Sequence, residues 1–163
     1  MSPSAKYLAR AGLIAALYVV IVYTFRPISF GPGQIRVAEA LAILPLFEGA
    51  AVPGLFFGCL FANLLGGLGP WDVVGGSLIT LIAAMLTHRS PGFLVGILPP
   101  IFLNAFGVSA YLSFLSGVPY PVLVPQILFG QVVAVGGIGG VLHAALSRIG
   151  GSMGLRRYYR HGS

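Results

Sequence analysis

The sequence predicts an all-α integral membrane protein with six transmembrane helices and both termini in the cytoplasm. Of its 163 residues, 57% are hydrophobic and only 7% are charged, whereas a soluble domain carries roughly a quarter charged residues. A soluble fold of ~150 residues leaves about a third of its surface in water, so most exposed positions here would be apolar. Lipid is therefore the solvent that fits this composition. We expect a single transmembrane domain over 1–163 in the cell membrane.

Charged residues and clusters of proline and glycine divide the chain into apolar segments. A helix needs about 20 residues to cross ~30 Å of hydrocarbon, and fewer where the bilayer thins or flanking residues snorkel. The second and third segments are shorter than a comfortable crossing. The spans are expected at about 6–25, 34–47, 51–65, 71–88, 92–116 and 122–148, followed by a basic cytoplasmic tail at 149–163.

Proline and glycine mark the breaks between and within these segments. The first segment lacks a small-residue cleavage site, so we expect a retained helix and no signal peptide; it ends before Arg26-Pro27, since proline disfavours the α conformation in its predecessor. Pro99-Pro100 predicts a kink in the fifth span, whose freed carbonyls neighbouring helices or a cavity must satisfy. A hinge is expected over 117–121. The spacings Gly54/Gly58 and Gly136/Gly140 predict close helix packing.

The distribution of basic residues predicts the orientation. Lys and Arg concentrate on the cytoplasmic side of membrane proteins. With six spans, only Arg26 and Arg36 fall on the outer side, and a five-span arrangement would split the basic ends between two sides. The basic residues that share the inner side in the six-span arrangement are Lys6, Arg10, Arg89, Arg148, Arg156, Arg157 and Arg160.

Polar side chains gather in the outer half of the predicted bundle. Ionisable groups inside a membrane are costly and are functional candidates. Of the three carboxylates, Glu48 is expected as a solvated loop residue at the inner end, while Glu39 and Asp72 belong to the outer half. Their common depth beside Gly- and Pro-rich connections predicts a pocket for a small, polar, planar ligand. Its expected lining residues are Arg36, Glu39, Asn63, Trp71, Asp72, Asn104, Gln126 and Gln131.

Each of these residues also has a purely structural interpretation. Arg36 and Glu39 are spaced as a helical ion pair, although the base precedes the acid, which is the less favourable order. Asp72 fits an N-terminal helix cap. The four amides fit interhelical hydrogen bonds that contribute about a kcal/mol or less. Only their shared depth favours a pocket.

Motifs for covalent chemistry are absent from the sequence. It has no Gly-x-Ser-x-Gly, no His-Glu-x-x-His and no Walker loop. The basic residues do not form a stripe interleaved with exposed aromatics, which argues against nucleic acid as a partner. We therefore expect no enzyme, no cofactor and no metal site. Active transport would take its energy from a partner or an ion gradient.

Several ordered blocks in the first half of the chain form a recognisable series. The blocks are Gly31-Pro32-Gly33-Gln34-Ile35-Arg36-Val37-Ala38-Glu39-Ala40-Leu41, Leu44-Pro45, Pro53-Gly54-Leu55, Gly58-Cys59, Ala62-Asn63-Leu64-Leu65-Gly66-Gly67, and Asp72 with Gly76-Ser77-Leu78. They resemble the QueT family, the queuosine-precursor substrate-binding subunits (S components) of energy-coupling factor (ECF) transporters. The blocks between 34 and 87 are specific, whereas the last third of the chain matches mainly in length and hydropathy.

The resemblance implies a six-helix S component that binds its substrate from outside. Such a subunit docks through its first helix onto a transmembrane T subunit driven by two ATPase subunits, which alone use ATP. Ala11 and Ala15 match the docking pattern of the family. The loop over 26–34, with Phe30 and Gln34, would act as a lid.

The implied substrate is a 7-deazaguanine such as queuine or the prequeuosine base. Glu39 or Asp72 would accept hydrogen bonds from the ring N–H and exocyclic amine, and the other carboxylate would meet an ammonium. Asn63, Gln126 or Arg36 would donate to the ring carbonyl, and Trp71 or Phe30 would stack on the ring. An S component for another micronutrient, a stand-alone carrier and a purely structural membrane protein remain the alternatives.

Overall fold

The computed structural model describes residues 2–29, 36–67 and 69–152. The expected lid residues Phe30 and Gln34, and the basic tail from residue 153 onward, lie outside these ranges. Within them every regular element is helical, as the sequence predicts. The elements are α1 (Pro3–Thr24), α2 (Arg26–Ser29), the 3₁₀ helix η1 (Val37–Leu46), α3 (Ala51–Leu65), the π-helix η2 (Trp71–Gly76), α4 (Ser77–His88), α5 (Phe93–Gly96), α6 (Leu98–Leu103), the π-helix η3 (Asn104–Val108), α7 (Ser109–Ser116), α8 (Tyr120–Gln131), the π-helix η4 (Val132–Ile138) and α9 (Gly139–Ser152).

Four continuous helical stretches are long and apolar enough to cross a membrane. They are Ser4–Thr24, Trp71–His88, Phe93–Ser116 and Tyr120–Ile149, and the shorter apolar helices are η1 and α3. Large apolar side chains cover the outside of these helices; Leu13 on α1 and Phe114 on α7, for example, are 70% and 85% exposed. Such a surface suits lipid and not water.

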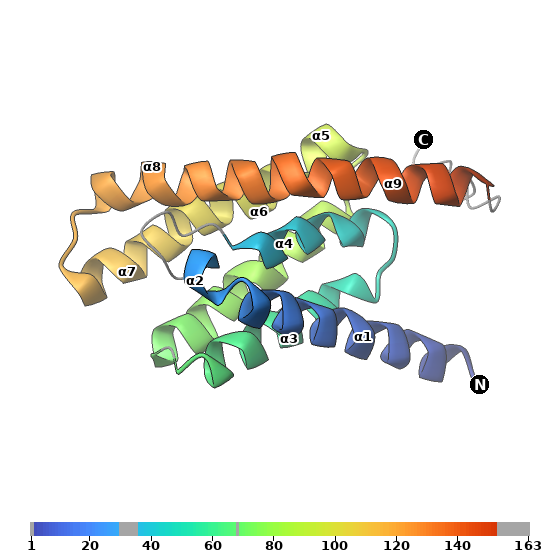
Figure 1. Ribbon diagram of the computed structural model, residues 1–163, viewed down its shortest axis with the longest axis horizontal. Helices are drawn as coiled ribbons and strands as arrows, with labels where there is room; N and C mark the ends of the chain where they lie inside the picture. The colour runs from blue at the N-terminus through green and yellow to red at the C-terminus, as the bar shows by residue number, and fades with distance from the viewer. Residues whose placement is uncertain (1, 30–35, 68, 153–163) are drawn as a thin grey trace.

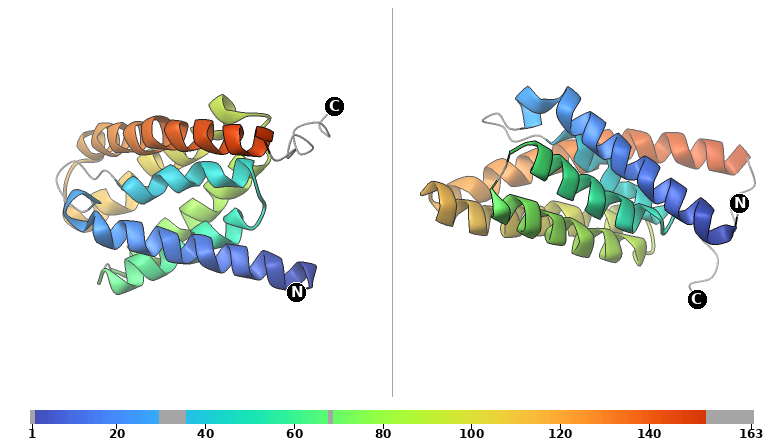
Figure 2. Two further views of the ribbon diagram at one scale, coloured as in Figure 1. Left: turned by 45° about the vertical axis from the view of Figure 1, so that its right-hand side comes forward. Right: turned by 90° about the horizontal axis from the view of Figure 1, so that it is seen from below.

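The short helix η1 forms the centre of the bundle. It lies between α1 and α3 on one side and α9 with η4 on the other (Figure 1). Its residues are apolar on nearly every side, which is typical of a helix buried all round. Ile43 and Ala38 are fully buried, and η1 contributes to both hydrophobic clusters of the core. The start of α1 and the end of α9 lie at the same end of the bundle, away from the turn between α7 and α8 (Figures 1 and 2).

The close packing predicted for Gly54 and Gly58 is confirmed at the crossing of α1 and α3. A Cβ atom at Gly54 would lie 2.9 Å from the carbonyl oxygen of Ala11, and one at Gly58 would lie 2.7 Å from the Cβ of Tyr18. Any larger residue would push the two helices apart. The same expectation is wrong for Gly136, where a Cβ would meet nothing within 4 Å. Gly136 lies in a shallow apolar hollow on the outside of η4.

The break predicted at Pro99-Pro100 is confirmed. Helix α5 ends at Gly96 and α6 begins at Leu98. Proline has no N–H, so Pro100 cannot donate to the carbonyl of Gly96, four residues earlier. The hydroxyl of Thr87 on α4 donates to that carbonyl instead, at 2.8 Å. A neighbouring helix thus satisfies the freed carbonyl.

The predicted hinge over 117–121 is also present. Helix α7 ends at Gly117, whose φ of 72° lies in the left-handed region, and glycine adopts that conformation without steric cost. Helix α8 then begins at Tyr120, with Pro121 in its first turn. The last two long helical stretches therefore run antiparallel, joined at the end of the bundle away from the termini (Figure 1).

Candidate ligand-binding site

Several of the predicted polar residues lie in or beside helices that depart from regular α geometry. Glu39 lies in η1, a 3₁₀ helix of 10 residues, although such helices seldom exceed 3–4 residues. Asp72 and Asn104 lie in the π-helices η2 and η3, and Gln131 immediately precedes η4. Single π turns are frequent at functional sites, since they widen the backbone and redirect side chains.

Two buried side chains from two other helices contact the carboxylate of Glu39. We call these three residues the deep cluster: Tyr18, Glu39 and Asn104. The hydroxyl of Tyr18 donates to Oε1 of Glu39 at 2.6 Å, and Nδ2 of Asn104 donates to Oε2 at 3.1 Å. None of the three is more than 4% exposed. A carboxylate offers about four lone-pair positions, so each oxygen of Glu39 keeps capacity for a further donor.

Two further buried polar atoms have no hydrogen-bond partner among the described residues. They are Oε1 of Gln131 and Oγ of Ser109, whose side chains are 4% and 0% exposed. Both lie on helices that pack on η3 or continue it, the element that carries Asn104. A buried polar atom without a partner costs roughly 1–3 kcal/mol, so the oxygen of Gln131 is available to a donor from outside the described residues.

A second group of polar side chains, the outer cluster, consists of Arg36, Asn63, Asp72 and Tyr111. Nη2 of Arg36 donates to Oδ1 of Asn63 at 2.9 Å, and Nδ2 of Asn63 donates to the carbonyl of Asp72 at 2.7 Å. The Tyr111 hydroxyl donates to Oδ1 of Asp72 at 3.0 Å. Asn63 thus joins α3 to η2 and to the residue that precedes η1.

The two clusters are adjacent along η1. Arg36 immediately precedes this helix, and its carbonyl accepts a hydrogen bond from the N–H of Glu39 at 2.9 Å. Helices η1 and η2 begin, and α3 and α7 end, at the end of the bundle away from the start of α1 (Figure 2). The outer cluster is therefore at that end of the molecule, as the sequence predicts.

Six of the eight predicted lining residues belong to this region. Arg36, Asn63 and Asp72 are joined in the outer cluster, Glu39 and Asn104 in the deep cluster, and Gln131 is buried nearby on α8. Trp71 is 57% exposed and Gln126 is also exposed. Neither side chain takes part in a hydrogen bond recorded within the described ranges.

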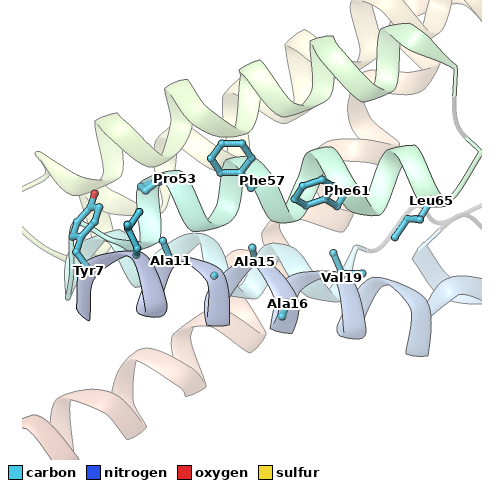
Figure 3. Close-up of a pocket in the computed structure, with 11 residues that line it drawn as sticks. Tyr7, Ala11, Ala15, Ala16, Val19, Pro53, Phe57, Phe61 and Leu65 are labelled. Atoms are coloured by element: carbon cyan, nitrogen blue, oxygen red, sulfur yellow. The ribbon is translucent and has the colours of Figure 1, made fainter. Parts of the chain in front are cut away.

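The predicted docking residues Ala11 and Ala15 face α3. Each is 8% exposed, and together they form the floor of a groove between α1 and α3 (Figure 3). Their neighbours Gly12 and Ala16 are the exposed small residues of the groove.

Sequence reasoning missed Tyr18 and Ser109. Tyr18 carries the first polar group after Arg10 in the apolar first span, and its position in the middle of that span was a usable signal. Ser109 offers no such signal, because serine is common in helices that bind nothing. The contact of Tyr111 with Asp72 joins residues 39 positions apart, and the sequence does not predict it.

Comparison with known proteins gives these clusters a context. A sequence model described as "QueT transporter" matches residues 8–148. A similar protein is the "Queuosine precursor transporter QueT" of Lactococcus lactis subsp. cremoris (strain MG1363), which is 37% identical over 73 residues, covering 43% of this chain and 42% of that protein. The aligned part of this chain thus spans less than half the length of that relative. No solved structure matches the chain significantly.

The match extends over most of the chain; it includes both clusters and all or most of each long apolar stretch found in the described residues. The resemblance predicted from the sequence blocks is confirmed. The protein is a multi-pass membrane protein, and it belongs to the QueT transporter family.

Proposed function

We propose that this protein is the substrate-capture subunit of an ECF-type importer and that it binds a queuosine precursor, a 7-deazaguanine base such as queuine or the prequeuosine base. The observation that carries the proposal is a buried carboxylate, Glu39, with acceptor capacity left on both oxygens. A second buried acceptor, Oε1 of Gln131, has no partner among the described residues and lies on α8, which packs on the helix that carries Asn104. The name of the Lactococcus relative points to the same substrate class.

The deep cluster suits a ligand with several adjacent donors. A deazaguanine carries a ring N–H beside an exocyclic amine, and a carboxylate can accept both. Tyr18 and Asn104 each donate a hydrogen bond to one carboxylate oxygen of Glu39. These two bonds orient the carboxylate before the ligand binds. Pre-organisation of this kind reduces the free energy lost in ordering the site on binding.

The outer cluster suits the rest of such a ligand. The Arg36 guanidinium is planar and can donate to a ring carbonyl, and the carboxylate of Asp72 keeps acceptor positions for the ammonium of an aminomethyl group. The ligand would enter from the side of this cluster. We propose six spans, with η1 and α3 as the two short ones and both termini in the cytoplasm, which places the outer cluster toward the exterior.

A matched pair of glutamate variants tests the ligand site. Glu39→Gln removes the charge but keeps the shape, and we expect the affinity of the purified protein for the prequeuosine base to fall about 30-fold or more, the loss for a buried charge-assisted pair. Glu48→Gln is the control, because Glu48 lies at the other end and pairs with Arg10 at 3.2 Å. Isothermal titration calorimetry measures both. Unchanged binding in Glu39→Gln and also in Asp72→Asn would contradict the proposal.

We propose that a T subunit and two ATPase subunits supply the energy and that α1 carries the contact with the T subunit. The support is the family resemblance together with the groove on α1, whose small residues allow a partner to approach closely. Because Ala11 and Ala15 form the floor of the groove, the exposed Gly12 and Ala16 would make the first contact.

A further inference from the structure

An apolar groove on the outside of the bundle adjoins a polar pocket at one end. The groove, about 630 Å³, runs between α1 and α3 and is walled by Phe57 and Phe61 (Figure 3). The pocket, about 240 Å³, contains His88 and Arg89 from the end of α4. Tyr7 and Pro53 line both hollows, so the two are neighbours.

The polar pocket carries positive charge. Within the described ranges, no partner is recorded for the guanidinium of Arg89, which is exposed. Nδ1 of His88 lies 2.7 Å from the carbonyl oxygen of Pro45. Because a carbonyl oxygen only accepts, Nδ1 holds a proton. Nε2 of His88 lies beside Gly49, which lines the pocket. Lys6 and Arg10 are near in sequence to Tyr7. The carboxylate of Glu48 is paired with Arg10.

The length of the groove matches one leaflet of a bilayer. From Tyr7 to Val19 it follows α1 for about 18 Å at 1.5 Å per residue, and one leaflet contributes about 15 Å of hydrocarbon. Its polar end, at Tyr7, lies near the N-terminal end of α1, where a membrane-spanning helix meets the lipid headgroups. An apolar channel of this length with a cationic pocket at the headgroup level has the dimensions and charge of a phospholipid.

We propose that the groove and the pocket together are a binding site for an anionic phospholipid. One acyl chain lies in the groove between α1 and α3, and the phosphate binds the guanidinium of Arg89 beside His88. A guanidinium suits this role because it donates to a phosphate in bidentate fashion. The lipid occupies the groove in the free subunit. This site requires only that the protein spans the membrane, and it stands whether or not a transport partner later displaces the lipid.

Native mass spectrometry of the purified protein tests the proposal. The protein is mixed with equal amounts of phosphatidylglycerol and phosphatidylcholine that carry the same acyl chains. We expect the wild type to prefer phosphatidylglycerol and Arg89→Gln to bind it about fivefold less, the effect of one basic residue at a membrane surface. Arg148→Gln is the control, since this exposed cation on α9 does not line the pocket.

A second variant tests the acyl-chain part of the site. Gly12 lines the groove, and a Cβ atom there would meet nothing within 4 Å. Gly12→Leu therefore fills the groove without disturbing the packing of α1 on α3, and we expect it to lower the retention of both lipids.

Three results would overturn the proposal. They are equal binding of the two lipids by the wild type, equal losses in Arg89→Gln and Arg148→Gln, and unchanged retention in Gly12→Leu. Any of them would assign the groove to a protein helix or to ordinary surrounding lipid. Deazaguanine binding is measured separately on the same samples, so the proposal of the lipid site and the proposal of the ligand site can be contradicted independently.

Discussion

Tyr18 links the first helix to the buried carboxylate. Its side chain is 1% exposed; the Cβ atom packs where Gly58 leaves room, and the hydroxyl donates to Glu39 at 2.6 Å. The ring therefore belongs to the α1–α3 contact, while the hydroxyl belongs to the deep cluster. A substitution that separates these two roles shows what the hydrogen bond contributes.

Tyr18→Phe removes the hydroxyl and keeps the ring. We expect the affinity for the prequeuosine base to fall about tenfold, because a hydrogen bond to a charged group contributes roughly 1.5–3 kcal/mol and orients Glu39. Calorimetric titration measures the change. Tyr23→Phe is the matched control: its hydroxyl donates to the carbonyl of Leu65 at 2.7 Å in an exposed position. Equal affinities of the two variants would show that Tyr18 only packs.

At the scale of elements, a side chain from a neighbouring helix supplies the hydrogen bond that is lost where the fifth predicted span is broken. Pro100 removes the N–H that would reach the carbonyl of Gly96, and α4 supplies the hydroxyl of Thr87 in its place. Thr87 is fully buried, so water has no access to that carbonyl. A side chain of similar shape without a hydroxyl would leave it without a partner.

Thr87→Val is such a substitution. We expect it to lower the free energy of unfolding by about 1 kcal/mol, within the range measured for hydrogen bonds between membrane helices, and to lower the melting temperature of the detergent-solubilised protein. Thr24→Val is the control, because the Thr24 hydroxyl is exposed and donates only within α1, to Val20. If both variants melt together with the wild type, the Thr87 bond does not support the break.

For the whole molecule, the composition and the positions of proline and glycine predicted most of the architecture. Charge content alone indicated lipid as the solvent, and proline with glycine located the break after Gly96 and the hinge at Gly117. These features are local, so a single sequence carries them. The two short helices could not be assigned as spans by length, and η1 is central because of its packing against the other elements.

The sequence predicted which residues belong to the candidate site better than it predicted the contacts between them. Rarity of charge in an apolar chain singled out Glu39 and Asp72, and depth grouped them with the amides. Their partners are long-range: Tyr18 lies 21 residues from Glu39, and Asn104 lies 65 residues from it. The π-helices that redirect Asp72 and Asn104 have no sequence signature of their own. Depth alone also did not separate the buried members from the exposed Trp71.

Uptake of radiolabelled prequeuosine base tests the central claim, capture without autonomous transport, most directly. The measurement compares proteoliposomes that hold this protein alone with proteoliposomes that also hold a T subunit and two ATPase subunits, with ATP on the ATPase side. The account predicts saturable binding without accumulation by the protein alone, and ATP-dependent accumulation by the complete assembly. Accumulation of the base by the single chain, without the partners, would contradict it.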